Sequence, residues 1–239
     1  MMKKNEIEKI CNDKQRCVWL MTSTPEPIRT IFTATRTCYS PNDQVYLAYD
    51  EWFKYVNKEA KDFPNDAIRL LSKIASMKHL SVLEHVSFTF GVKGVSRSLL
   101  AQLTRHRAGW SYSVQSQRYV SFDSEKKDGF DFIIPASIKS NKIARAEFNQ
   151  RMKDIQHSYN VMVQNGVPAE DARYILPNAA ITNATVTCNL RSLLDFYQKR
   201  SIKAAQWEIR ELAEDFKTAV LKEVPDMQYI FDAVIEKEE

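Results

Sequence analysis

One fifteen-residue segment concentrates the groups of this chain that could do chemistry. Residues 105–119, RHRAGWSYSVQSQRY, hold three arginines, one histidine, three serines and three aromatic residues. Guanidinium groups bind phosphate through paired hydrogen bonds. An isolated RHR triplet is more often a solvated basic loop. Arg105 and Arg107 lie too close in sequence to serve one flat surface, so each could hold a different anion.

Motifs that are missing narrow the chemistry further. The five glycines form neither GxGxxG nor GxxxxGK[ST], so arginines must hold any nucleotide phosphate. No GxSxG or HExxH sequence occurs, and the four histidines lack the spacing of zinc ligands. The sequence therefore disfavours a hydrolase or a metalloenzyme.

The composition is that of an ordinary globular protein. Of 239 residues 44% are hydrophobic and 27% charged, and the net charge of +4 is too small to indicate nucleic acid binding. The four cysteines form no CxxC pair and suggest neither a disulfide framework nor a zinc site, which favours a reducing cytoplasm. No segment approaches the roughly 18 apolar residues of a membrane span. We expect a soluble, cytoplasmic protein.

Hydrophobic periodicity predicts the elements that must position the arginines. We expect strands at 18–22, 86–92 and 181–190. We expect helices at about 25–39, 65–79, 96–106, 143–165 and 204–223, and a further helix that begins near residue 192. Asn65 and Ser96 are the expected N-caps of two of these helices. The chain has no repeat, low-complexity tract or Gly/Ser linker, so we expect one α+β domain over 1–239 with a frayed tail at 233–239.

The segment RHR, then serine, then QRY resembles the signature of flavin-dependent thymidylate synthases, where seven residues separate RHR from serine. Here eight residues separate Arg107 from Ser116, and the extra residue falls within 108–111. The resemblance continues in order through HLSVLEHVSFTF (79–90), GVSRSLLAQLTRHR (94–107), ARYILPNAAITNATVTCNLRSLLDFYQKR (172–200) and AQWEIR (205–210). It therefore covers most of the chain.

The resemblance implies roles for individual residues, with Arg200 as the catalytic residue that acts on the uracil ring. The implied dUMP contacts are Gln102, Arg105, Gln115, Ser116, Gln117, Arg118, Arg173 and Arg200. The implied FAD contacts are His79, Ser81, Arg105, His106, Arg107, Val114, Asn189, Arg191 and Asp195. Val114 and Asp195 depart from the family, which commonly has Glu or Gln at the first position and His or Asn at the second.

Several of these residues also have a purely structural interpretation. Arg173 could be a helix-surface charge, and Asn189 could cap the end of a strand. We expect His85 to form a buried hydrogen-bonded pair with Glu84. Cys188 is expected to be buried, which leaves no convincing cysteine nucleophile of the kind that other thymidylate synthases use.

The resemblance implies an α+β fold whose central, mostly antiparallel sheet is flanked by helices. It also implies methylation of dUMP to dTMP with 5,10-methylenetetrahydrofolate and NADPH as cosubstrates and FAD as hydride carrier. The family forms homotetramers with active sites at subunit interfaces, and no nucleic acid or membrane partner is expected.

Two other functions compete with this interpretation. An RNA or DNA binder would use the same arginines for phosphates and the aromatic residues for base stacking. A flavoprotein of the same fold with a changed substrate would account for the extra residue of the motif and for Asp195.

Overall fold

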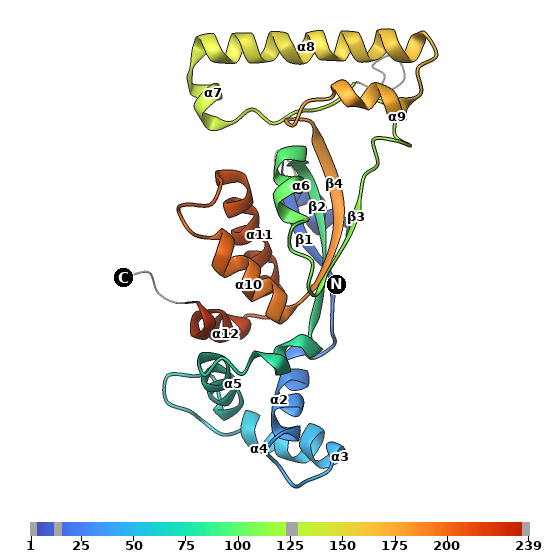
Figure 1. Cartoon of the computed structure of the whole chain (residues 1–239). Helices are drawn as coiled ribbons and strands as arrows, with labels where there is room; N and C mark the ends of the chain where they lie inside the picture. Colours follow the sequence, from blue (N-terminus) through green and yellow to red (C-terminus); the bar gives the residue numbers. More distant parts are fainter. Residues whose placement is uncertain (1–3, 12–15, 123–128, 236–239) are drawn as a thin grey trace. The chain divides into compact units, whose positions relative to one another are not determined.

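The computed structural model describes residues 4–11, 16–122 and 129–235, and within them a sheet with the strand order β1-β2-β4-β3 (Figure 1). The strands are β1 (Cys17–Ser23), β2 (Ser87–Ser96), β3 (Trp110–Val114) and β4 (Ile181–Asn189). The α-helices are α1 (Lys4–Cys11), α2 (Pro27–Thr37), α3 (Gln44–Tyr46), α4 (Trp52–Val56), α5 (Asp66–Ser76), α6 (Arg97–Leu103), α7 (Ala136–Ser140), α8 (Lys142–Gln164), α9 (Ala169–Ala172), α10 (Leu190–Arg200), α11 (Trp207–Glu223) and α12 (Met227–Val234). The other helical segments are the π-helix η1 (Leu47–Glu51) and the 3-10 helices η2 (Leu80–His85) and η3 (Arg173–Ile175).

The sheet is antiparallel, as expected. Two contacts show that β2 and β4 run in opposite directions. The Thr89 and Thr187 hydroxyls are hydrogen-bonded, and further along β2 the Gly94 N–H donates to the side chain of Asn183, which comes earlier on β4. Helices flank this sheet, so the α+β class predicted from the sequence is confirmed.

The chain forms two compact units. Unit 1 comprises residues 1–91, 106–112 and 186–239, and unit 2 comprises 92–105 and 113–185. Strands β2, β3 and β4 each contribute residues to both units. The sequence contains no linker that would mark this division, and it predicted one domain.

Unit 1 contains the larger apolar core. Helix α11 packs along β1, and the rings of Phe90 on β2 and Phe216 on α11 lie 4.6 Å apart. Capping fixes the local structure, because the Asn65 side chain accepts a hydrogen bond from the Ile68 N–H and so starts α5 where the sequence predicted. The alternating pattern of β4 places Val186 and Cys188 in this core.

Unit 2 has a small core of its own beneath the long helix α8. Phe130, Met152 and Ala180 are buried there, and Phe132 and Phe148 pack against them. The Ser96 side chain accepts from the Leu99 N–H at the start of α6, as predicted. This helix ends at Leu103, three residues earlier than expected, so Arg105 lies beyond its last turn.

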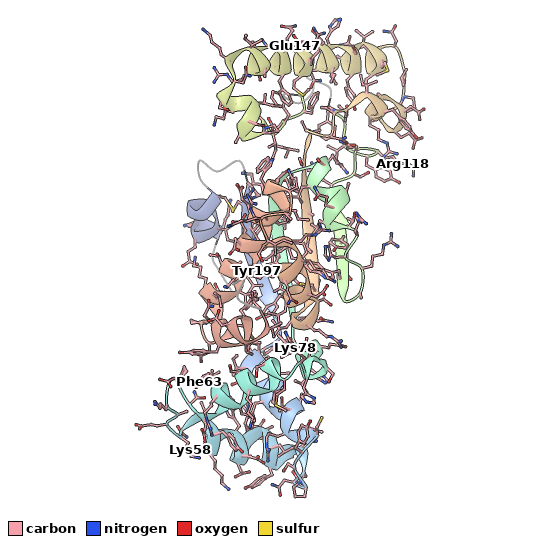
Figure 2. All side chains as sticks on the ribbon, turned by 60° about the vertical axis from the view of Figure 1, so that its left-hand side comes forward. Lys58, Phe63, Lys78, Arg118, Glu147 and Tyr197 are labelled. Atoms are coloured by element: carbon pink, nitrogen blue, oxygen red, sulfur yellow. A yellow bond between two sulfur atoms is a disulfide. The ribbon has the colours of Figure 1, made fainter. Side chains whose placement is uncertain are left out.

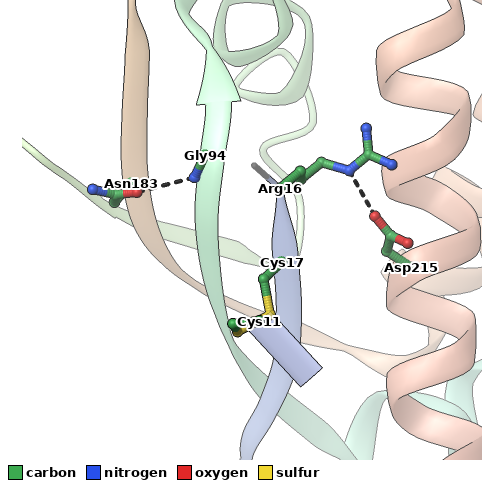
Figure 3. The surroundings of a disulfide bond; sticks show 6 residues. All are labelled: Cys11, Arg16, Cys17, Gly94, Asn183 and Asp215. Carbon is green, nitrogen blue, oxygen red and sulfur yellow. Dashed lines mark hydrogen bonds and ion pairs between the residues drawn. A yellow bond between two sulfur atoms is a disulfide. The ribbon is translucent and has the colours of Figure 1, made fainter. Parts of the chain in front are cut away.

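The prediction that the cysteines form no disulfide was wrong. The end of α1 and the start of β1 bring Cys11 and Cys17 to a Cα–Cα distance of 5.3 Å, and the two are disulfide-bonded (Figure 3). The neighbouring Arg16 donates to Asp215 at 2.7 Å and to Glu211 at 2.8 Å on α11. This end of β1 is therefore held to α1 covalently and to α11 by charge.

One further expectation needs correction at the C-terminus. Helix α12 was not predicted, and it continues to Val234, whose side chain is buried and whose carbonyl accepts a hydrogen bond from Lys78 at 3.1 Å. Residues 233 and 234 are therefore helical instead of frayed, and residues 236–239 of the expected tail lie outside the described residues. None of the described helices is long and apolar enough to cross a membrane.

Candidate functional site

A tight turn follows the RHR triplet at the point where the sequence carries its extra residue. The Trp110 N–H donates to the Arg107 carbonyl at 3.2 Å, and Gly109 between them has a φ of +71°. The Ser192 hydroxyl donates to the Ala108 carbonyl at 2.8 Å. A Cβ atom on Gly109 would overlap the Ser192 hydroxyl. The extra length is thus absorbed in a turn that requires glycine and touches α10.

His106 and Arg200 meet in unit 1. The Arg200 Nε donates to the His106 Nε2 at 3.0 Å. The imidazole also lies edge-on to Phe196 with 4.9 Å between ring centroids, one helical turn before Arg200 on α10. The carbonyl of His106 accepts a hydrogen bond from the Tyr112 hydroxyl at 2.6 Å. Two residues that the sequence linked to one reaction are therefore in direct contact.

A cavity of about 540 Å³ opens at the start of α10, and we call it the α10 cavity. Three residues predicted to contact FAD line it, namely Asn189, Arg191 and Asp195. The cavity is also lined by Leu80, Glu84, Ala108, Gly109, Ser192, Gln198 and Val234. Its size falls in the roughly 300–1,000 Å³ range of small-molecule sites.

Asn189 caps the helix that follows its strand. Its Oδ1 accepts from the Ser192 N–H at 2.8 Å, so it is the N-cap of α10, and the residue also lines the α10 cavity. Arg191 is ion-paired with Glu84, and Asp195 with Lys199 at 2.7 Å. The cavity wall therefore carries two ion pairs.

Two other predicted residues lie apart from this cavity. His79 and Ser81 are exposed at the two sides of Leu80, and neither lines the α10 cavity. Ser81 instead lines a second cavity of about 630 Å³, together with Arg29, Thr37 and other residues of α2; we call this the α2 cavity. Unit 1 thus divides the predicted FAD contacts between separate places.

The structure overturns the expected pairing of Glu84 with His85. Both residues are exposed, Glu84 pairs with Arg191, and His85 lines the α2 cavity. The sequence reasoning missed Glu84 as a lining residue of the α10 cavity. A carboxylate three residues after the predicted contact Ser81 was the available signal, and it was assigned to the wrong partner.

Four of the predicted dUMP contacts in unit 2 form one segment, Gln115–Arg118, which we call the 115–118 segment. The Gln115 N–H donates to the Asn183 carbonyl at 2.9 Å, and the Asn183 amide donates back to the Gln115 Oε1 at 3.0 Å. The Ser116 hydroxyl accepts from the Arg118 N–H at 3.1 Å. Strand β4 therefore fixes one end of the segment, and a serine turn shapes the other.

Glu170 connects two of the predicted arginines. Its carboxylate is ion-paired with Arg118, which Figure 2 labels, and its carbonyl accepts a hydrogen bond from the Arg173 Nε at 2.9 Å. The Arg118 guanidinium also lies over the Tyr119 ring at 5.2 Å. Arg118 and Arg173 are therefore close to a shared partner.

Arg97, which the sequence reasoning did not single out, joins this group. Its Nη2 donates to the Gln115 carbonyl at 2.8 Å. The pKa of Arg97 is lowered by burial of the guanidinium and by the positive charge of Arg173. Its position directly after the Ser96 cap was the only available signal.

The remaining predicted residues lie around these groups. Gln102, Arg105 and Val114 belong to unit 2, with Arg105 exposed and the other two partly exposed. Arg107 belongs to unit 1 and is exposed. The RHR triplet is therefore shared between the units. Apart from Arg200, the predicted dUMP contacts are in unit 2, whereas most predicted FAD contacts are in unit 1.

The fold resembles that of solved enzymes acting on nucleotides. The structure of thymidylate synthase X from Helicobacter pylori with FAD and dUMP matches with a TM-score of 0.66, 25% sequence identity and coverage of 92% of this chain and 100% of that one. The fold of the UMP/dUMP methylase PolB from Streptomyces cacaoi matches with a TM-score of 0.73, at 21% identity over 92% and 96% of the two chains. The chain thus has the thymidylate synthase X fold.

Sequence comparison identifies the family. The family model described as thymidylate synthase complementing protein matches residues 19–226. A flavin-dependent thymidylate synthase from Geobacter sulfurreducens is 43% identical over 194 residues, which cover 81% of this chain and 77% of the relative. The enzyme of that name from Clostridium tetani is 38% identical over 226 residues, covering 88% and 84%. This chain belongs to the flavin-dependent thymidylate synthase family.

Proposed function

We propose that this chain methylates dUMP to dTMP, with methylenetetrahydrofolate as one-carbon donor and NADPH-reduced FAD as hydride carrier. The family match over residues 19–226 carries the proposal. The arginines around the 115–118 segment and the donors of the α10 cavity support it, because they are the groups that a nucleotide and a flavin dinucleotide require.

The α10 cavity fits part of a flavin dinucleotide. Gly109 lets Ser192 and Asn189 pack against the turn at its wall, and Arg191 and Asn189 offer hydrogen-bond donors. When bound, FAD would supply the hydride that completes the methyl group. Arg191 and Asn189 would hold it, and Asp195 is proposed to lie beside it.

Arg200 is the proposed catalytic residue. Its Nε is engaged by His106, and its Nη1 and Nη2 make no hydrogen bond within the described part of the chain. A guanidinium held in this way would stabilise negative charge that develops on the uracil ring, without having to reorganise during the reaction. His106 would act as its positioning residue.

The cysteines support a mechanism without a protein nucleophile. Cys188 is buried, and burial raises the pKa of its thiol far above neutral, so the thiolate is disfavoured. Cys11 and Cys17 are joined in the disulfide. Cys38 is free and exposed, but it lines the α2 cavity, which none of the predicted dUMP contacts lines. The activation of uracil therefore falls to electrostatic groups such as Arg200.

The assembly and location of the enzyme are part of the same proposal. We propose a cytoplasmic homotetramer whose active sites lie at subunit interfaces. The two described cavities of unit 1 are each smaller than FAD, dUMP and folate together would need, which supports sites completed by a second subunit. Light scattering should give a mass four times that of the chain.

The test measures flavin and chemistry in one preparation. The purified protein should show the visible absorption of bound flavin, and it should release tritium from C5 of labelled dUMP only when NADPH and methylenetetrahydrofolate are present. A colourless protein that stays inactive after FAD is added would refute the proposal. Strongly salt-dependent binding of RNA or DNA by that protein would then favour a nucleic acid binder.

A further inference from the structure

A lysine occupies a backbone position that favours glycine at the end of α5. Lys78 has a φ of +61°, and its N–H donates to the Ala75 carbonyl at 3.0 Å. The next N–H, that of His79, donates to the Ile74 carbonyl at 3.2 Å. These two bonds form the turn that commonly ends a helix with a left-handed glycine, and a residue with a Cβ atom is unfavourable there. The turn alone does not explain a lysine.

Helix α8 ends in the same turn with glycine at the matching position. The Gly166 N–H donates to the Val163 carbonyl at 3.1 Å, and the Val167 N–H donates to the Met162 carbonyl at 3.0 Å. Gly166 has a φ of +86°. The chain therefore builds one turn with glycine and the other with lysine. What distinguishes the turn at α5 is the lysine side chain and the group that it contacts.

The Lys78 side chain joins the end of α5 to the end of α12. Its Nζ donates to the Val234 carbonyl at 3.1 Å, and Figure 2 labels the lysine. Val234 is the last residue of α12, where carbonyl groups lack partners within the helix and the helix dipole attracts a cation. Helix α12 also packs against α5, where the Ser72 hydroxyl donates to the Tyr229 carbonyl at 3.5 Å. Packing thus holds the body of α12, and Lys78 holds its end.

This contact lies beside the wall of the α10 cavity. Val234 is only 3% exposed, and it lines the cavity. Leu80 also lines the cavity, and it follows Lys78 by two residues at the start of η2. Helix α10, which carries the lining residues Arg191 and Asp195, packs against η2. Movement of the end of α12 would therefore displace one side of the cavity.

We infer that Lys78 is a positioning residue of the α10 cavity, which holds the end of α12 so that Val234 forms part of the wall. Lys78 does not itself line the cavity, so it acts through Val234 and not on the ligand. The unfavourable backbone conformation of Lys78 is offset by this contact. The inference rests on the proposed function for the ligand, FAD, but not for the contact between the helices.

The test separates stability from flavin binding. Lys78→Gly removes the unfavourable φ, so the flavin-free protein should melt about 1–4 °C higher. Its affinity for FAD, measured by quenching of flavin fluorescence, should nevertheless fall about 5-fold to 20-fold, as expected for the loss of one charged hydrogen bond. Lys78→Met keeps the aliphatic stem without the ammonium group and should bind FAD equally weakly.

Two further variants serve as controls for the same measurement. Lys78→Arg keeps a charged donor and should bind FAD within about 2-fold of the wild-type protein. Lys73→Met removes an equal charge from the last turn of α5 and should change neither the affinity nor the melting temperature. Unchanged affinity in both Lys78→Gly and Lys78→Met, or an equal loss in Lys73→Met, would overturn the inference.

Hydrogen exchange tests the contact between the helices without flavin. The Ile235 N–H donates to the Phe231 carbonyl at 3.0 Å at the end of α12. Its exchange should be about 5-fold to 20-fold faster in Lys78→Met than in the wild-type protein, and unchanged in Lys73→Met. Equal exchange in all three proteins would overturn the inference. If Lys78→Met speeds this exchange but the wild-type protein binds no FAD, the contact stands and the proposed function fails.

Discussion

The hydrogen bond between Arg200 and His106 constrains both partners. An arginine Nε can only donate, so the Nε2 of His106 must accept and therefore carries no proton. The Arg200 guanidinium is consequently fixed on one edge, with its terminal nitrogens directed away from that bond. A neutral imidazole is thus part of the arrangement that orients the proposed catalytic arginine.

Replacement of Arg200 by lysine tests this arrangement. Lysine keeps the charge but has no planar fork and no Nε to hold against His106. We expect tritium release from labelled dUMP to fall about 100-fold while dUMP affinity changes little. Arg210→Lys on α11 is the matched control, since that guanidinium contacts only the Lys203 carbonyl among the described residues. An equal loss in the control would remove the assignment.

The ion pair between Glu170 and Arg118 should compete with the nucleotide. Both side chains are about half exposed, so the pair contributes little to stability, roughly 0.2–1 kcal/mol. We expect Glu170→Gln to release Arg118 and to tighten dUMP binding about 2-fold to 5-fold, measured by calorimetry. Glu147 lies on α8 (Figure 2), and Glu147→Gln breaks a comparable exposed pair with Arg151, which should leave binding unchanged. Weaker binding in Glu170→Gln would contradict competition.

At the scale of elements, N-cap residues and alternating hydrophobicity predicted most of the helices and strands that position the site. The caps at Asn65 and Ser96 and the strand at 181–190 were all confirmed. Strand β3 was missed because its five residues alternate between partly exposed and exposed, so no apolar face marks it. The site residues could be named from the resemblance, but their partners could not. Glu84 pairs with Arg191, which is 107 positions away, and Glu170 pairs with Arg118, which is 52 positions away.

The turn at Gly109 provides a test at this scale. Gly109→Ala should remove bound flavin absorption and lower the free energy of unfolding by about 1–3 kcal/mol, because alanine adds both an unfavourable φ and an overlap with Ser192. Gly166 has a similar φ of +86°, and a Cβ there would meet nothing within 4 Å. Gly166→Ala should therefore cost only about 1 kcal/mol and keep the flavin. If both variants lose flavin and unfolding free energy to the same extent, the close contact between Gly109 and Ser192 has no part in flavin binding.

For the whole molecule, the sequence predicted the class of fold but not its division into two units. Unit 2 is made of two stretches, 92–105 and 113–185, and the chain passes between the units within strands instead of through a linker. A boundary inside a strand leaves no compositional signal, because the residues on its two sides belong to one continuous strand. The Cys11–Cys17 disulfide was missed because the two cysteines are six positions apart and form no CxxC pair.

That disulfide should affect the stability of the whole protein. The sequence separation of the two cysteines is 6, and closing so short a loop adds about 2 kcal/mol to the free energy of unfolding. We expect a dithiol reductant to lower the melting temperature of the wild-type protein and to leave Cys11→Ser, which already lacks the bond, unaffected. If reductant shifts both proteins equally, the effect comes from elsewhere in the chain.

Trp110 gives this molecule an optical reporter. Its indole stacks on Tyr112 at 5.9 Å and 7° between planes, and it contacts Phe196 one turn before Arg200. The near-ultraviolet absorption of a flavin overlaps tryptophan emission, so a flavin bound in the α10 cavity would quench Trp110 by energy transfer. Occupancy of the site could then be followed in real time by intrinsic fluorescence, without label or substrate.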